Sequence, residues 1–113
     1  MQSVMPMKID LLYFDDCPSW KSGLENLKSA MAREGLQANI NLVQVTNDDQ
    51  ATRLRFLGSP SFVVNGVDLW EETRDAYHLS CRVYMTPEGV KGAPTIGMLQ
   101  EKLRTNKNLL QNP

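Results

Sequence analysis

Strand-like and helix-like patterns alternate along the first half of the chain, and this alternation restricts the fold more than any other feature. Residues 9–14 form a short, mostly apolar run that fits a strand buried on both faces. Residues 40–45 predict a second strand. Residues 18–33, between them, carry an apolar stripe with helical spacing, formed by Trp20, Leu24, Leu27 and Met31. Two strands that are separated by a helix usually lie parallel to each other and are joined by a right-handed crossover.

The next segment adds a short helix and a hairpin. Asn47 followed by Gln50 three residues later resembles a capping box and predicts a helix that ends at Gly58. Asn65-Gly66 lies between two apolar runs, which is the strongest short-range signal for a β-hairpin. We therefore expect an α/β fold in which a mixed four-stranded sheet is flanked by helices on both faces.

The last third of the chain is less regular. Residues 71–83 carry apolar side chains at helical spacing, which allows a helix there, although no cap marks its start. Residues 86–94 contain two prolines and two glycines and are predicted as a loop. A final helix from about Thr95 is expected to fray over residues 106–113. The chain is predicted to be one domain, residues 1–113, with its core within residues 7–105.

Composition and charge exclude several classes of function. The chain has 113 residues, too few for a second core. Its 12 basic and 13 acidic residues give a net charge of −1, which provides no basic field for nucleic acid or an anionic membrane. No apolar run is long enough to cross a bilayer, and the first residues lack the pattern of a signal peptide. We therefore expect a cytoplasmic protein whose two cysteines rest as thiols.

Cys17 lies at the junction between the first predicted strand and the first predicted helix. The positive N-terminal end of a helix favours thiolate over thiol at such a position, whereas the neighbouring carboxylates of Asp15 and Asp16 oppose it by a similar amount. Trp20 stands where a second cysteine would complete a C-x-x-C pair. The sequence therefore leaves two hypotheses for Cys17, a nucleophilic thiol or an inert, partly buried one.

Cys81, 64 positions downstream, is the only internal candidate to resolve a mixed disulfide on Cys17. The alternative, which the usual burial of free cysteine favours, places Cys81 in the core beside Val83. Two cysteines and the single histidine, His78, cannot form a preformed zinc site, and His78 is predicted to lie at the surface. A soft ion such as Hg(II) needs only two thiolates, so Cys17 and Cys81 could hold one if they converge. No cofactor is expected.

Three motifs fall in the same order as in a known family: Cys17-Pro18-Ser19-Trp20 after the first strand, Ser59-Pro60-Ser61 before the third, and Asn65-Gly66 in the following turn. On these residues the chain resembles the thioredoxin-like superfamily over residues 7–105. It is similar to small bacterial thioredoxin-like proteins with a C-x-x-W variant of the motif, some of which carry the label alkylmercury lyase.

The resemblance implies a thiol–disulfide oxidoreductase in which Cys17 is the nucleophile and Cys81 a candidate resolving cysteine. It implies a cis peptide before Pro60, with the backbone N–H and C=O of Ser59 free to pair with an extended substrate peptide. Trp20 would then stand beside the thiol, although its place on the apolar stripe favours core packing. The expected partner is a protein or a low-molecular-weight thiol or disulfide. The alternative is a non-enzymatic binding module for a peptide or Hg(II). An exposed edge of the expected sheet would also allow two copies of the chain to form a homodimer.

Overall fold

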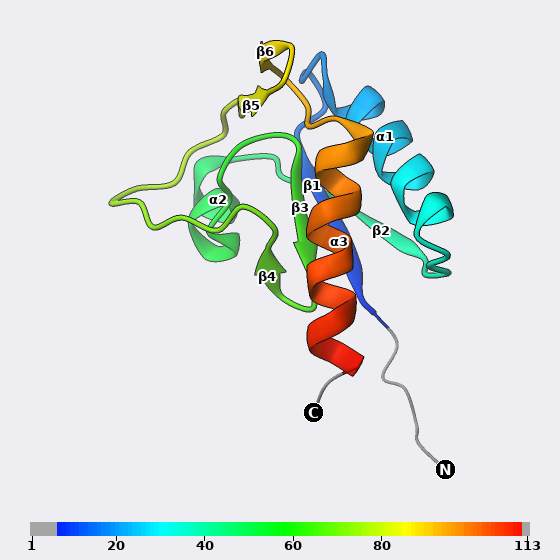
Figure 1. Cartoon of the computed structure of the whole chain (residues 1–113). Helices are drawn as coiled ribbons and strands as arrows, with labels where there is room; N and C mark the ends of the chain where they lie inside the picture. The colour runs from blue at the N-terminus through cyan, green and yellow to red at the C-terminus, as the bar shows by residue number, and fades with distance from the viewer. Residues whose placement is uncertain (1–6, 112–113) are drawn as a thin grey trace.

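The centre of the molecule is a mixed sheet of four strands (Figure 1). The computed structural model describes the backbone of residues 7–111 and the side chains of residues 7–105. The strand order is β2-β1-β3-β4, with β1 parallel to β2 and antiparallel to β3, and with β3 antiparallel to β4. Their bounds are Ile9–Tyr13 for β1, Ile40–Gln44 for β2, Ser61–Val64 for β3 and Val67–Asp68 for β4. The predicted mixed four-stranded sheet is therefore confirmed.

Helices cover both faces of this sheet, as predicted. Helices α1 (Trp20–Arg33) and α3 (Ile96–Gln111) lie side by side on one face, and α2 (Asp48–Leu54) lies on the other (Figure 1). The larger core lies between the sheet and helices α1 and α3, and it includes Ile9, Leu11, Leu27, Phe62, Leu99 and Leu103. The smaller core beneath α2 contains Leu12, Val45, Ala51 and Phe56. Burial of these apolar side chains is the main force that holds the layers together.

The capping pattern at α2 forms as the sequence predicts. Asn47 Oδ1 accepts the backbone N–H of Gln50 at 2.9 Å, and Gln50 Oε1 accepts the backbone N–H of Thr46 at 2.8 Å. The helix ends earlier than the predicted Gly58, because Arg55 adopts a left-handed backbone at φ 52°. That turn carries Phe56, which is fully buried, into the smaller core.

The Asn65-Gly66 hairpin also forms as predicted. Both residues have positive φ angles, 52° and 86°, which is the requirement of a two-residue type I′ turn. The turn joins Val64 to Val67, which are paired in the register of β3 and β4.

Two local predictions in the last third are wrong. Residues 71–83 form no helix; they run outward past α2 and return to the upper end of the sheet (Figure 1). The segment 86–94 is only partly a loop, since Tyr84–Thr86 (β5) and Gly89–Lys91 (β6) form a second hairpin in which Gly89 has φ 108°. Helix α3 is described as far as Gln111, and residues 112–113 of the tail that is predicted to fray lie outside the described residues. No helix among residues 7–111 has the length and apolar character needed to cross a membrane.

Candidate functional site

The turn before β3 is the centre of the candidate site. The peptide bond between Ser59 and Pro60 is cis, and both residues are buried. Ser59 Oγ accepts the backbone N–H of Phe14 at 3.2 Å, which ties this turn to the end of β1. Helix α1 approaches closely at Gly23, where an added Cβ would lie 3.0 Å from Pro60 Cγ. The turn is therefore fixed between β1 and α1.

Cys17 lies against this turn. Only 5% of the residue is exposed, and its backbone N–H donates to the Phe14 carbonyl at 3.1 Å. Its Sγ donates to the carbonyl oxygen of Ser59 at 3.4 Å. Helix α1 begins at Trp20 with Ser19 as its N-cap, so Cys17 precedes the first helical turn. The helix dipole acts mainly within that turn, which weakens its influence on the Cys17 thiol.

Cys81 lies on the other side of Ser59. The favoured sequence prediction, a core position beside Val83, is wrong: Cys81 is exposed, and Val83 is 67% exposed. Ser59 and Cys81 pair in a parallel β-bridge. The residues on either side of Cys81 make the backbone hydrogen bonds to Ser59, and this pairing holds Cys81 at the surface of the protein.

Those hydrogen bonds also correct the expected role of Ser59. Its backbone N–H donates to the carbonyl of Ser80 at 2.8 Å, and its carbonyl accepts the N–H of Arg82 at 3.0 Å. Both backbone groups were predicted to be free for a substrate peptide. The chain itself occupies them.

Cys17 affects the titration of the Cys81 thiol. The pKa of Cys81 is raised above that of an ordinary cysteine, first by the atoms packed around the sulfur. The negative charge of Cys17 and a hydrogen bond between the two side chains raise this pKa further. Two cysteines separated by 64 positions in sequence are thus brought together at the cis proline turn.

A buried ion pair fixes the segment that carries Cys81. Arg82 Nη1 lies 2.9 Å from Asp68 Oδ2 and donates to Ser61 Oγ at 3.1 Å, and Nη2 donates to the Trp70 carbonyl at 2.6 Å. The Arg82 and Asp68 side chains are only 5% and 12% exposed. Neither residue is predicted from the sequence, because no local pattern links two positions that are 14 residues apart.

Gly58 allows this segment to approach the turn. It has φ 119°, and a Cβ placed there would lie 2.8 Å from Arg82 Cβ and 3.0 Å from Arg82 Cα. Its signal in the sequence is its place immediately before Ser59-Pro60, since glycine is the residue that permits close backbone contact. The segment that carries Cys81 is therefore held by the Arg82–Asp68 ion pair and also depends on a glycine at position 58.

Tyr84 holds the start of β5 against the same turn. Its hydroxyl donates to the Pro60 carbonyl, and its ring lies under the Arg82 guanidinium, 5.2 Å from Arg82 Cζ to the ring centroid. Burial raises the pKa of the Tyr84 hydroxyl far above its usual value. The hydroxyl thus remains a hydrogen-bond donor at neutral pH.

Trp20 and His78 occupy positions that bear on two further expectations. Trp20 stacks on Tyr13, with ring centroids 4.0 Å apart and an interplanar angle of 24°, and packs against the larger core. His78 is on the surface, as predicted, with its Nδ1 3.6 Å from Asp48 Oδ2 and 65% of its side chain exposed. The imidazole faces the start of α2, so it is not placed as a base for Cys17.

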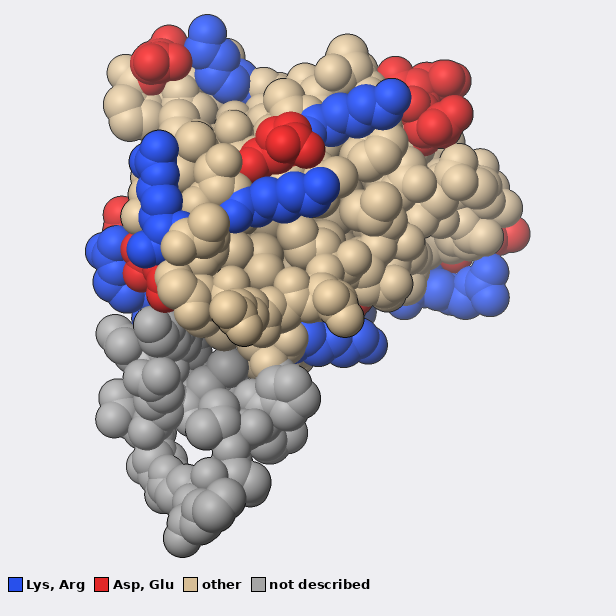
Figure 2. Space-filling view, turned by 90° about the vertical axis from the view of Figure 1, so that its right-hand side faces the viewer, with Lys and Arg blue, Asp and Glu red and all other residues tan. Residues whose placement is uncertain are grey.

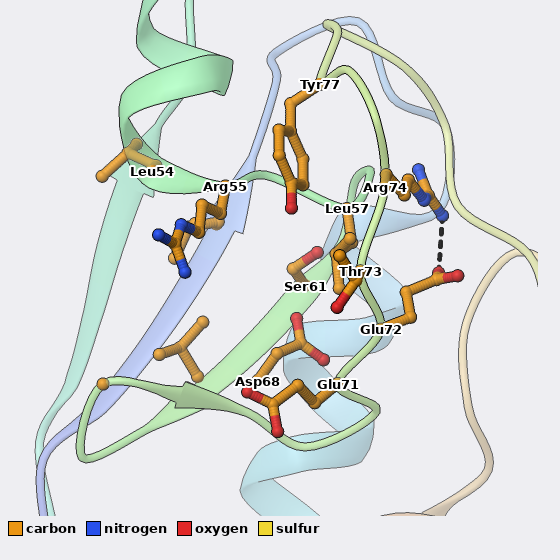
Figure 3. Close-up of a pocket in the computed structure, with 13 residues that line it drawn as sticks. Leu54, Arg55, Leu57, Ser61, Asp68, Glu71, Glu72, Thr73, Arg74 and Tyr77 are labelled. Atoms are coloured by element: carbon orange, nitrogen blue, oxygen red, sulfur yellow. Dashed lines mark hydrogen bonds and ion pairs between the residues drawn. The ribbon is translucent and has the colours of Figure 1, made fainter.

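A cavity of about 470 Å³ lies under residues 71–77, on the face of the sheet that carries α2 (Figure 3). Tyr77 and Arg55 point into it from one side, and Asp68 and Glu71 line the other. None of the predicted site residues lines it. Charges of both signs share its wall, including an Arg74–Glu72 pair 2.7 Å apart, so the lining does not select for one sign of ligand.

The outer surface shows no concentration of charge on the face that carries α1. Acidic and basic side chains are interspersed over that face, in agreement with a net charge of −1 (Figure 2). Within residues 7–111, no group of three or more His, Cys, Asp or Glu side chains is placed to hold a metal ion.

Comparison of the chain with models of protein families, with curated proteins and with solved structures finds no match. The site is therefore interpreted from its own geometry.

Proposed function

We propose that the chain is a thioredoxin-like protein that exchanges thiols and disulfides through a dithiol formed by Cys17 and Cys81. One observation carries the proposal: both cysteines contact Ser59, Cys17 through a hydrogen bond from its Sγ and Cys81 through a β-bridge. Thiol–disulfide exchange requires a second thiol that can reach a mixed disulfide on the first. A pair held on either side of one residue meets this requirement without a C-x-x-C motif.

The arrangement of elements supports the same assignment. A cysteine follows β1, a cis proline precedes β3, and the order β2-β1-β3-β4 places the two at the same end of the sheet. These are the features that the resemblance implies for a thioredoxin-like fold. Pro60 and Ser59 then shape the site from beneath, and Trp20 supports the Cys17 loop by packing on Tyr13.

The reaction balances within the pair and its partner. Cys17 and Cys81 form one S–S bond and release two protons and two electrons. The partner, a disulfide of a protein or of a small molecule, accepts them as its own S–S bond breaks and becomes two thiols. The dithiol is restored by a reducing thiol such as glutathione, and in the cytoplasm the reduced form would be the resting state.

The test is equilibration of the purified protein in glutathione redox buffers, followed by acid quenching and peptide mass spectrometry. We expect a peptide that links Cys17 to Cys81 and is two hydrogens lighter than its reduced components. Cys17→Ser and Cys81→Ser should each abolish it, whereas Ser22→Ala, on the exposed face of α1, should leave it unchanged. Failure of the wild-type protein to form this link at any glutathione ratio would contradict the proposal.

A second candidate function rests on the same pair of thiols. Two adjacent thiolates, one of them exposed, suit a soft ion such as Hg(II), which accepts two sulfur ligands. If the chain is such a binding module, one equivalent of Hg(II) should protect both cysteines from alkylation. Cys17→Ser and Cys81→Ser should each lose this protection. Hg(II) binding without a Cys17–Cys81 disulfide in glutathione buffers would favour the binding module over the exchange protein.

A further inference from the structure

The position that an extended substrate would take beside Ser59 is already filled. Ser80 and Arg82 use the Ser59 backbone N–H and C=O as a neighbouring β-strand would, at 2.8 and 3.0 Å. A substrate main chain cannot make these hydrogen bonds unless residues 80–82 leave. An outside disulfide must therefore reach the pair by another route.

The exposure of the two cysteines defines that route. Residues 81–85 alternate strictly: Cys81, Val83 and Met85 are exposed, and Arg82 and Tyr84 are buried. Cys81 is thus presented outward by an extended segment whose inward side chains are fixed. Cys17 is 5% exposed and lies against Ser59. Attack on a disulfide requires a nearly linear approach of three sulfur atoms, which an exposed thiol allows and a covered one obstructs.

The segment is held in place by more than its two backbone bonds. Arg82 is bound by Asp68, Ser61 and the Trp70 carbonyl, and Gly58 lets the Arg82 backbone sit close to the turn. Release of the segment would break these hydrogen bonds together and would also expose the buried ring of Tyr84. Spontaneous release of this segment to uncover Cys17 is accordingly rare.

We propose that Cys81 is the thiol that meets outside disulfides and that Cys17 is the thiol that resolves them. This inference rests on the proposed function and assigns the order of its two steps. It replaces the order expected from the sequence, in which Cys17 attacks first. It also means that the substrate is engaged at its sulfur atoms, without addition of a strand at Ser59.

The two steps balance as follows. The thiolate of Cys81 attacks one sulfur of the outside disulfide, that S–S bond breaks, and the departing thiolate takes up the proton that Cys81 released. The thiolate of Cys17 then attacks Cys81 Sγ, the mixed disulfide breaks, and the second outside thiol leaves with the proton from Cys17. The protein ends with a Cys17–Cys81 disulfide, and the outside disulfide has gained two electrons and two protons.

Cys17 is near enough to Cys81 to affect its titration, as the second step requires. The negative charge of Cys17 is one of the causes that raise the pKa of Cys81.

The experiment compares the single-cysteine variants Cys17→Ser and Cys81→Ser in oxidised glutathione. Cooperative urea unfolding first establishes that each variant is folded. We expect the mixed disulfide to form on Cys81 of the first variant at least about tenfold faster than on Cys17 of the second. In concentrated urea the difference should shrink to within about threefold, since burial is then removed and only intrinsic thiol reactivity remains.

A second measurement uses the wild-type protein and does not depend on the variants. Brief exposure to oxidised glutathione, acid quenching and peptide mapping should place the first mixed disulfide on Cys81. A first mixed disulfide on Cys17, or faster reaction of Cys17 in the variants, would overturn the proposed order while a Cys17–Cys81 link preserves the exchange function. Absence of that link would overturn the function itself, and the order with it.

Discussion

Ser59 and Cys81 are paired in a parallel β-bridge, although 22 positions separate them in the sequence and neither lies in a long strand. Because Ser59 also accepts a hydrogen bond from Cys17 Sγ, this bridge is what gives Cys17 a thiol partner. The features that maintain the bridge are therefore expected to control the chemistry of both cysteines.

Substitution of Gly58 should displace the segment that carries Cys81. In Gly58→Ala the new Cβ would lie 2.8 Å from Arg82 Cβ and 3.0 Å from its backbone, and φ 119° is unfavourable for alanine. We expect a loss of roughly 1–3 kcal/mol in the free energy of unfolding from backbone strain, with more from the contact. The rate of Cys17 alkylation should rise. Urea unfolding and peptide-resolved alkylation measure the two effects.

Gly35→Ala is the matched control for Gly58→Ala. Gly35 also has a positive φ, 67°, but no atom lies within 4 Å of the position that its Cβ would take. It should lose only the conformational cost, about 1–2 kcal/mol. Cys17 alkylation should remain at the wild-type rate. Equal acceleration in both variants would mean that global destabilisation, and not the contact with Arg82, uncovers Cys17.

Removal of the buried Arg82 side chain should strongly destabilise the fold. Arg82→Ala leaves Asp68 buried without its ion-pair partner, and we expect a loss of about 3–5 kcal/mol in the free energy of unfolding. Arg74→Ala is the comparison, since Arg74 pairs with Glu72 at 2.7 Å while both side chains are exposed (37% and 48%), and it should lose at most about 1 kcal/mol. Similar losses in the two variants would contradict the anchoring role of Arg82.

The pH dependence of Cys81 alkylation should report its contact with Cys17. Because the Cys81 pKa is raised, its alkylation midpoint should lie above that of a free cysteine peptide. In Cys17→Ser the midpoint should fall toward the free value, since the charge and the hydrogen bond of Cys17 are lost and only the burial remains. Peptide-resolved mass spectrometry over a pH series measures both midpoints. An unchanged midpoint in the variant would mean that the two thiols do not interact in solution.

Tyr84 should make the protein sensitive to alkali. Its folded-state pKa is raised by burial, so the folded state holds this proton while the unfolded state begins to lose it near pH 10. The free energy of unfolding of the wild-type protein should therefore decrease as pH rises above about 10. Tyr84→Phe should lose about 0.5–1.5 kcal/mol at neutral pH with its hydrogen bond to Pro60, and should show a shallower alkaline decrease. Urea unfolding at pH 7 and pH 10.5 tests this, and parallel decreases would contradict it.

Much of the scaffold could be predicted because its signals are local. The helical spacing of Leu24, Leu27 and Met31 and the Asn65-Gly66 turn depend on neighbours a few positions away, and both structures form where expected. The last third could not be predicted in the same way. Residues 71–83 have apolar spacing that is compatible with a helix. Near the end of this segment, however, the backbone groups of Ser80 and Arg82 form hydrogen bonds with Ser59 instead.

For the candidate site, local sequence patterns identify the residues that could supply the chemistry. They place Cys17 after a strand, a proline before the third strand, and Cys81 as the sole second thiol. The fold, in contrast, brings both cysteines to Ser59, leaves Cys81 exposed and Cys17 buried, and pairs the backbone of Ser59. The physical reason is that buried polar groups must find partners wherever the fold provides them. The ion pair of Arg82 with Asp68 and the close approach at Gly58 are such long-range contacts, which no local sequence pattern encodes.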